Sequence, residues 1–186
     1  MAFLTTLWLP IVLSAVLVFI ASSIIWAALQ LHKNDYTQTP HDAAFQAVLR
    51  DNAMGPGLYC IPSRHDGETP AAYQERFTKG PCALLAVPSG PFNFGKTLGL
   101  WFLNQLVLAA LIAYVAHAAI PTGDSAPSYF AVFRVVGAVA LLAHAGMAAN
   151  DTLWRFLGWR HAASSLFDGV VYAALTAGCF AGLWPR

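Results

Sequence analysis

Four polar side chains within long apolar stretches are the first candidates for chemistry in this chain: Asn104, Arg134, His144 and Asp168. Placing a charged group in an apolar environment costs free energy, so such a group is expected to have a charged or polar partner, to face a hydrated cavity or to serve a function. An imidazole and a carboxylate can exchange a proton near neutral pH. We therefore treat these four residues as a candidate intramembrane polar site.

Two hypotheses account for Asp168, His144 and Asn104. In the first they form a proton or cation site. In the second they form a polar clasp, in which Asp168 accepts hydrogen bonds from His144 and Asn104 and fixes the helix register. We favour the clasp. Arg134 also has a structural alternative, because its long side chain can reach the outer interface and pair with Asp124.

The elements that must position these residues are four stretches long enough to cross a membrane, at residues 3–31, 98–120, 129–149 and 162–183. Among ten basic and nine acidic residues, only Arg134 and Asp168 fall inside them. With 58% hydrophobic and 10% charged residues, the composition is that of an integral membrane protein. Counting about 1.5 Å per residue puts Asp168, His144 and Asn104 near one depth and Arg134 roughly 15 Å away.

We therefore expect an all-α membrane protein, a bundle of four transmembrane helices with a small extramembrane α+β insertion. The predicted division is helix one at 1–31, the insertion at 32–97 and helices two to four at 98–186. Within the insertion, Thr39-Pro40 and Thr69-Pro70 have the residue types of helix starts, with threonine as the N-cap. Residues 57–62 and 82–87 read as two short strands that pair with each other. In helix four, the small residues Gly169, Ala173, Ala177, Gly178 and Gly182 allow close packing, within the bundle or between protomers.

The distribution of lysine and arginine predicts the orientation. Lys33 and Lys96 flank the insertion, and Arg155 and Arg160 lie between helices three and four, whereas the turn 121–128 has no basic residue. The positive-inside rule then places residues 32–97 in the cytoplasm and both termini outside. In that reducing compartment we expect Cys60 and Cys82 to be free thiols. A bridge between them would overturn the orientation.

A match to the phosphate-binding pattern G-x-x-x-x-G-K-[ST] spans residues 90–97. We interpret it as a turn that leads the chain to the bilayer, because Pro91 removes a backbone donor and the following helix is too apolar for a nucleotide domain. The six histidines show no metal-ligand spacing, and no nucleophile motif is present. We therefore expect no cofactor, no metal and no enzyme activity. No basic cluster indicates nucleic acid.

Several segments together resemble a family of small four-helix bacterial integral membrane proteins that is uncharacterised. They are His32-Lys33-Asn34-Asp35-Tyr36, Lys79-Gly80-Pro81, Val87-Pro88-Ser89-Gly90-Pro91, Gly95-Lys96-Thr97-Leu98, Trp101-Phe102, Phe167-Asp168-Gly169, Leu175-Thr176-Ala177-Gly178 and Leu183-Trp184-Pro185. The resemblance covers nearly the whole chain and implies a location in the bacterial inner membrane. It implies no activity, cofactor or catalytic residue.

The first functional hypothesis is a structural or accessory membrane protein that contacts the lipid bilayer and binds a protein partner through residues 32–97. The motivation is an ordered insertion of mixed charge joined to a bundle with few polar groups. The alternative is a small oligomeric transporter or channel with a polar site around Asp168 and His144. The sequence leaves a homo-oligomer open.

Overall fold

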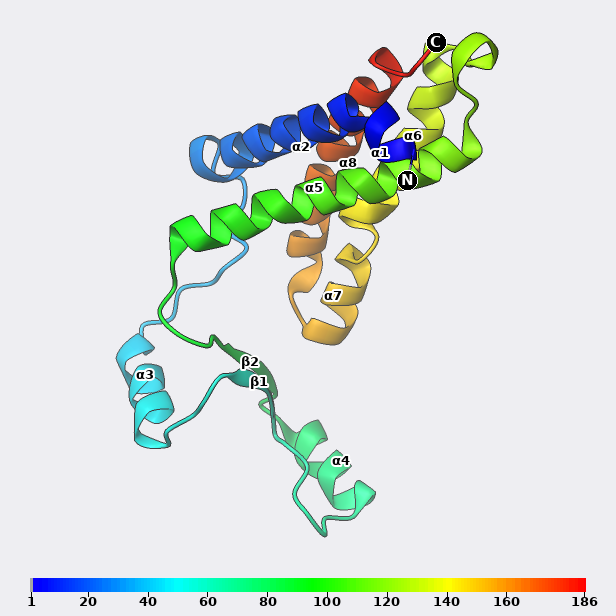
Figure 1. Ribbon diagram of the computed structural model, residues 1–186. Coiled ribbons are helices and arrows are strands. Elements are labelled where there is room, and N and C mark those ends of the chain that lie inside the picture. Colours follow the sequence, from blue (N-terminus) through cyan, green and yellow to red (C-terminus); the bar gives the residue numbers. More distant parts are fainter. Residues whose placement is uncertain (1) are drawn as a thin grey trace. The chain divides into compact units, whose positions relative to one another are not determined.

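The computed structural model describes residues 2–186, which form two compact units (Figure 1). The helical unit combines the chain up to Tyr36 with Phe94–Arg186, and the small unit is Thr37–Asn93. The protein is 67% helical, with four helices long and apolar enough to span a membrane and one two-stranded sheet. The helical unit therefore extends five residues further along the chain than the predicted boundary at Leu31, and resumes at Phe94 rather than Leu98.

The helical unit consists of α1 (Ala2–Thr6), α2 (Trp8–Ser23), the π-helix η1 (Ile24–Ala28), α5 (Phe94–Ala119), the 3-10 turn η2 (Gly123–Ser125), α6 (Tyr129–Ala145), α7 (Ala148–Arg155) and α8 (Gly158–Gly182). The four apolar helices expected from hydropathy are confirmed. Two of them begin four residues before the predicted starts, at Phe94 and Gly158. The third predicted stretch is divided, because α6 ends at Ala145 and α7 follows it.

The core of the helical unit is built largely from small side chains, with α6 and α8 in the most extensive contact. A Cβ added to Gly169 of α8 would lie only 2.5 Å from the Cβ of Ala145 on α6. Ala173 and Ala177 continue the same buried face, and Ala177 meets Gly137. Gly169, Ala173 and Ala177 thus serve close packing within the chain, because a larger side chain at Gly169 would push the two helices apart, whereas a Cβ added to Gly182 would meet nothing within 4 Å.

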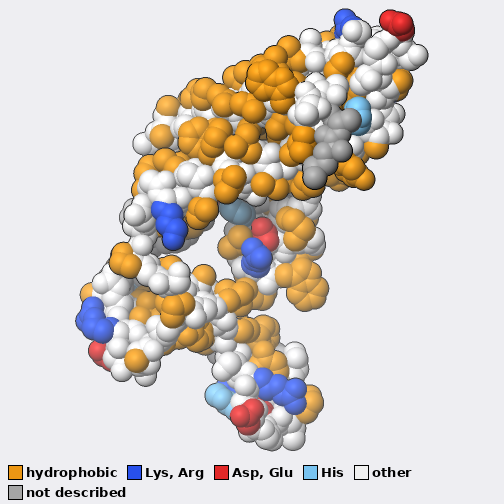
Figure 2. All heavy atoms as spheres, in the orientation of Figure 1, with side chains coloured by type: hydrophobic (Ala, Val, Ile, Leu, Met, Phe, Trp, Pro, Cys, Tyr) orange, Lys and Arg blue, Asp and Glu red, His pale blue; other side chains and the backbone are white. Residues whose placement is uncertain are grey.

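The outer surface of the helical unit is apolar. In each of the four long helices only 17–50% of the most apolar window is buried within the protein. Hydrophobic side chains occupy much of the face of this unit that Figure 2 shows, and the exposed large ones include Leu, Val, Phe and Trp. A helix that is apolar on every side and only partly covered by protein is typical of a membrane span.

The small unit contains α3 (Asp42–Asp51), β1 (Gly57–Ile61), α4 (Pro70–Lys79) and β2 (Ala83–Val87). The strands pair antiparallel, with Cys60 opposite Leu84. Thr69 caps α4 as predicted, accepting a hydrogen bond from the Ala72 N–H at 3.2 Å. The prediction for Thr39 is wrong: its hydroxyl accepts from the His41 N–H two residues later, a local turn, and α3 begins only at Asp42.

The loop before α4 is held by an ion pair. The Arg76 guanidinium donates two hydrogen bonds to the Glu68 carboxylate, at 2.8 and 2.9 Å, and a third to the Ser63 carbonyl at 2.7 Å. The hydrogen bonds from Arg76 and from the His65 N–H lower the pKa of Glu68. Cys60 and Cys82 are both free, and the Cys82 thiol donates to the Phe77 carbonyl at 3.0 Å.

Candidate functional site

The site begins where the first long helix ends. After η1, Gln30 adopts a left-handed conformation with φ of 49°, which turns the chain back toward the bundle. The next residues form a turn in which the Asp35 N–H donates to the His32 carbonyl at 3.0 Å. The His32 ring stacks on the Trp26 indole with 4.0 Å between centroids and 3° between planes. This turn buries His32, which is 3% exposed, among the helices.

Asp35 lies beside the N-terminal turns of α8. Its side chain is 1% exposed, and its Oδ2 lies 2.7 Å from His32 Nδ1. Ser164 donates to Asp35 Oδ1 at 3.3 Å, while Arg160 Nε lies 3.7 Å from Oδ1 and His161 Nδ1 lies 3.6 Å from Oδ2. A buried carboxylate is thus surrounded by donors from one helix and from its own turn, which is the condition under which burying it becomes tolerable.

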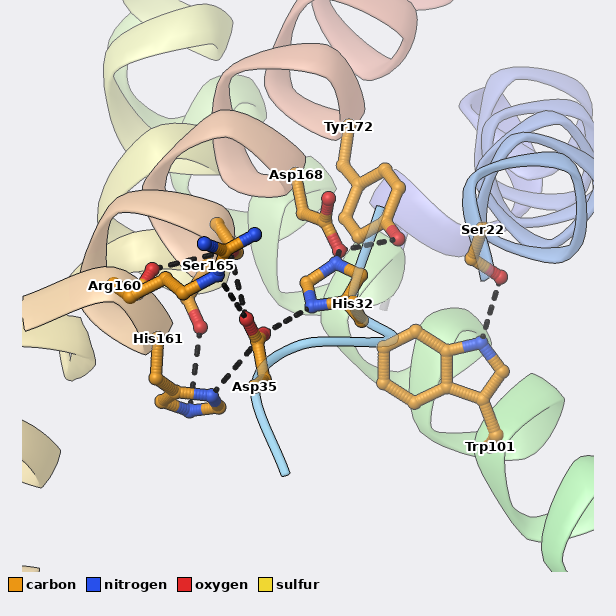
Figure 3. Close-up of polar contacts among 10 residues, drawn as sticks. Ser22, His32, Asp35, Trp101, Arg160, His161, Ser165, Asp168 and Tyr172 are labelled. Atoms are coloured by element: carbon orange, nitrogen blue, oxygen red, sulfur yellow. Dashed lines mark hydrogen bonds and ion pairs between the residues drawn. The ribbon is translucent and has the colours of Figure 1, made fainter. Parts of the chain in front are cut away.

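Asp168, two turns further along α8, faces the other side of the same imidazole. Its Oδ2 lies 3.0 Å from His32 Nε2 and accepts a hydrogen bond from the Tyr172 hydroxyl at 3.3 Å. The other oxygen, Oδ1, is buried and has no hydrogen-bond partner among residues 2–186. Figure 3 shows His32 between the two carboxylates, with the Tyr172 hydroxyl directed at Asp168. We call Asp35, His32 and Asp168 the Asp–His–Asp cluster.

A second group of polar side chains lies deeper between the helices. Ser14, Gln105, His144 and Thr176, one from each of α2, α5, α6 and α8, line an internal gap too narrow for a water molecule. Gln105 is 2% exposed, and its Nε2 finds no hydrogen-bond partner among the described residues. The His144 ring meets the Tyr172 ring edge to face, at 5.6 Å and 76°. Tyr172 therefore connects this group to Asp168.

The structure brings together some of the residues proposed from the sequence and separates others. Asp168 and His144 both contact Tyr172. Asn104 is exposed and does not bond to Asp168, so the predicted clasp partners are replaced by His32 and Tyr172. The physical reason is rotation: successive helical residues point about 100° apart, and α5 turns Gln105 rather than Asn104 inward.

Arg134 has a different environment. Its side chain is exposed on α6 and lines an open depression of about 260 Å³ formed with small and apolar residues of α6 and α8. It forms no ion pair with any residue from 2 to 186, so the proposed contact with Asp124 is not present in this structure. Its position suits a side chain that reaches outward along a lipid-facing surface.

His32 and Asp35 are the functional candidates that sequence reasoning missed, since both were assigned to the extramembrane insertion. One signal was available: two titratable residues three apart, directly after a long uncharged helix. It could not show that the chain turns back there. Chemically, the cluster can bind and exchange a proton, because both imidazole nitrogens face carboxylate oxygens. Within residues 2–186, no three His, Cys, Asp or Glu side chains are arranged to hold a metal ion.

Comparisons with known proteins add no family or activity: no protein-family model, no curated protein and no solved structure matches this chain.

Proposed function

We propose that the chain is a multi-pass protein of a bacterial inner membrane, whose helical unit crosses the bilayer four times. The support is the apolar surface of the four long helices, in each of which at least half of the most apolar window is not buried within the described protein. In water such a surface would drive aggregation, whereas in a bilayer it is the surface that lipid chains solvate.

The proposed orientation has both termini outside and the small unit in the cytoplasm. Support comes from the contact between Arg160 and Asp35. It places the segment after the first long helix, which contains Lys33, and the start of α8, which contains Arg160, at the same end of the helical unit. By the positive-inside rule that end faces the cytoplasm. Labelling with a membrane-impermeant maleimide tests it through Cys60 and Cys82, with the buried Cys179 as an internal control. We expect labelling only after lysis; labelling in intact cells would contradict the orientation.

The function we propose is that of an accessory membrane protein that binds a protein partner through the small unit. The observation that carries it is α3, an amphipathic helix with no buried residue, whose apolar side chains Phe45 and Val48 are 61% and 54% exposed. Asp42, Arg50 and Asp51 give this helix a net charge of −1, which does not favour an anionic bilayer surface. An exposed apolar face on a slightly acidic helix fits the groove of a protein partner.

A photo-reactive amino acid at position 45 or 48 of the full-length protein tests this in native membranes. We expect both positions to capture the same protein, and the matched position 46, a polar residue of the same helix, to capture none. The adduct formed from position 48 should disappear in a Phe45→Asp variant that remains in the membrane. Adducts with lipid alone, or equal capture from position 46, would end this proposal.

A second candidate, a small oligomeric proton-coupled transporter or channel, is favoured by one observation. Asp168 has a buried, unpartnered oxygen and accepts a hydrogen bond from Tyr172, whose ring lies against His144, and Asp and His side chains within a membrane are typical of proton pathways. It predicts a pH-dependent flux in proteoliposomes that is lost in Asp168→Asn and kept in Arg134→Gln. Equal flux in wild type and Asp168→Asn would remove this candidate.

A further inference from the structure

We infer that the Asp–His–Asp cluster is a proton-binding site. At neutral pH it holds one additional proton, counted from a state with a neutral imidazole and two ionised carboxylates. This proton completes the hydrogen bond between His32, which follows the first long helix, and Asp168 of α8. This inference rests on the contacts of the helical unit alone, and it depends neither on partner binding by the small unit nor on transport.

The first argument is the count of donors and acceptors. A neutral imidazole has one N–H donor and one lone-pair acceptor, and an ionised carboxylate only accepts. His32 presents Nδ1 to Asp35 Oδ2 at 2.7 Å and Nε2 to Asp168 Oδ2 at 3.0 Å. With a neutral ring and two carboxylates, one of these contacts would set a lone pair against a negative oxygen. Both contacts become hydrogen bonds only when the cluster holds an additional proton.

That proton can lie on the imidazole, on Asp168 or on Asp35, and the first two positions concern the contact between His32 and Asp168. With an imidazolium, Nδ1–H donates to Asp35 and Nε2–H donates to Asp168. With a neutral imidazole, a protonated Asp168 donates its O–H to Nε2, and its Oδ2 still accepts from Tyr172. The two forms differ only in the position of one hydrogen between Nε2 and Oδ2, so the proton belongs to the pair.

The second argument is the charge around the cluster. Asp35 and Asp168 contribute two negative charges, and among the neighbouring groups Arg160 contributes one positive charge. One more proton brings this sum to zero. Because the Arg160 side chain is 64% exposed, the charge that is buried falls from −2 to −1, which lowers the cost of burial. The remaining neighbours are His161 and Ser164 beside Asp35, Tyr172 beside Asp168, and Trp26 against the His32 ring. Beyond them, His144 of α6 faces the Tyr172 ring, while Ser22 of α2 and Trp101 of α5 bond to each other.

The route for the proton leads toward the start of α8. From His32 the next titratable groups are Asp35 and then His161, whose side chain is 22% exposed. On the other side, Asp168 Oδ1 is buried and unpartnered. Removal of the proton leaves one additional negative charge and one repulsive contact, so we expect Asp168 to separate from His32 and the turn at residues 31–36 to loosen in the cluster without that proton.

The test uses the full-length protein with ¹⁵N-labelled histidine in phosphatidylcholine nanodiscs at neutral pH. Sequence-specific nitrogen NMR of the His32 ring shows whether both nitrogens carry hydrogen, and infrared difference spectroscopy against Asp168→Asn shows a protonated carboxyl group. We expect one of the two signatures at pH 7, and its loss in Asp168→Asn. Ser165→Ala, a change on the same helix that removes a hydroxyl 3.5 Å from His161 Nε2, should keep it.

A wild-type His32 with a single N–H at pH 7, together with no protonated carboxyl signal, would overturn the inference. These nitrogen NMR and infrared measurements are made on the wild-type protein, so they test the inference even if a variant fails to fold. Retention of the full signature in Asp168→Asn would also contradict it, because an amide at that position can satisfy a neutral ring.

Discussion

Asp168 and Arg134 are both charged residues within long apolar helices, and the protein treats them in opposite ways. Asp168 is 7% exposed and bonded to His32 and Tyr172, whereas Arg134 is exposed and unpaired within the described chain. The difference follows from side-chain length. An arginine can carry its charge along a helix surface toward water, while a short aspartate must find partners where it stands.

Removing the two charges should therefore have very different effects. Asp168→Ala leaves the buried His32 Nε2 and the Tyr172 hydroxyl without their partner, so we expect a loss of about 3 kcal/mol in the free energy of unfolding. Arg134→Leu removes no internal partner and should change it by less than about 0.5 kcal/mol. Unfolding by sodium dodecyl sulfate in mixed micelles measures both. Equal effects would break the distinction between the two sites.

The packing next to Asp168 gives the second largest expected effect. Gly169→Val places methyl groups where a Cβ would already approach Ala145 at 2.5 Å, so α6 and α8 must separate at a cost of about 2 kcal/mol. Gly182→Ala is the matched control on α8, because nothing lies within 4 Å of its added Cβ. The same unfolding assay should leave Gly182→Ala close to wild type. An equally tolerated Gly169→Val would show that the close approach is not needed.

The stack of Trp26 on His32 should contribute less. Trp26→Leu removes an aromatic ring whose centroid lies 4.0 Å from that of the imidazole, and we expect a loss of about 1 kcal/mol in the free energy of unfolding. Trp8→Leu, at a tryptophan that is 60% exposed, serves as the control. If the two variants lose the same stability, the stack does not support the cluster.

The smallest effect is expected in the small unit, where the charged groups are near water. Hydrogen bonds from Arg76 depress the pKa of Glu68, so this pair stabilises the loop above the ordinary glutamate pKa near 4.5 and is lost as pH falls through the depressed value. After correction for the intrinsic pH dependence of exchange, the amide protection factors at residues 63–72 should therefore fall in acid. Glu68→Gln should remove this acid dependence, and Glu75→Gln, in an exposed pair with Lys79, should leave it intact.

Much of the fold could be predicted because its signals are local. Four uncharged or nearly uncharged stretches of spanning length identify the helices directly. Thr69-Pro70 marks the start of α4 for the same reason, since an N-cap acts within one turn. Thr39-Pro40 is the same dipeptide as Thr69-Pro70, but the Thr39 hydroxyl accepts a hydrogen bond from the His41 N–H in a local turn. The sequence alone does not distinguish a helix cap from such a turn.

The site was less predictable because it depends on rotation and on chain reversal. Counting the rise per residue gives the depth of Asn104 but not the direction it faces, and the adjacent Gln105 is the one buried. His32 and Asp35 lie beyond the apolar stretch, so hydropathy assigns them to the connection. Their burial requires the left-handed residue Gln30 and the contacts with α8, which are tertiary features.

The most direct test of the central claim is a double-mutant cycle between His32 and Asp168. Unfolding free energies of His32→Ala, Asp168→Ala and the double variant give the energy that couples the two side chains. We predict a coupling of at least about 1 kcal/mol, since the residues are in direct contact at 3.0 Å. The pair His32→Ala and Arg134→Leu should be additive within about 0.5 kcal/mol. Additivity of His32 and Asp168 would contradict the claim that a buried hydrogen bond joins the end of the first long helix to α8.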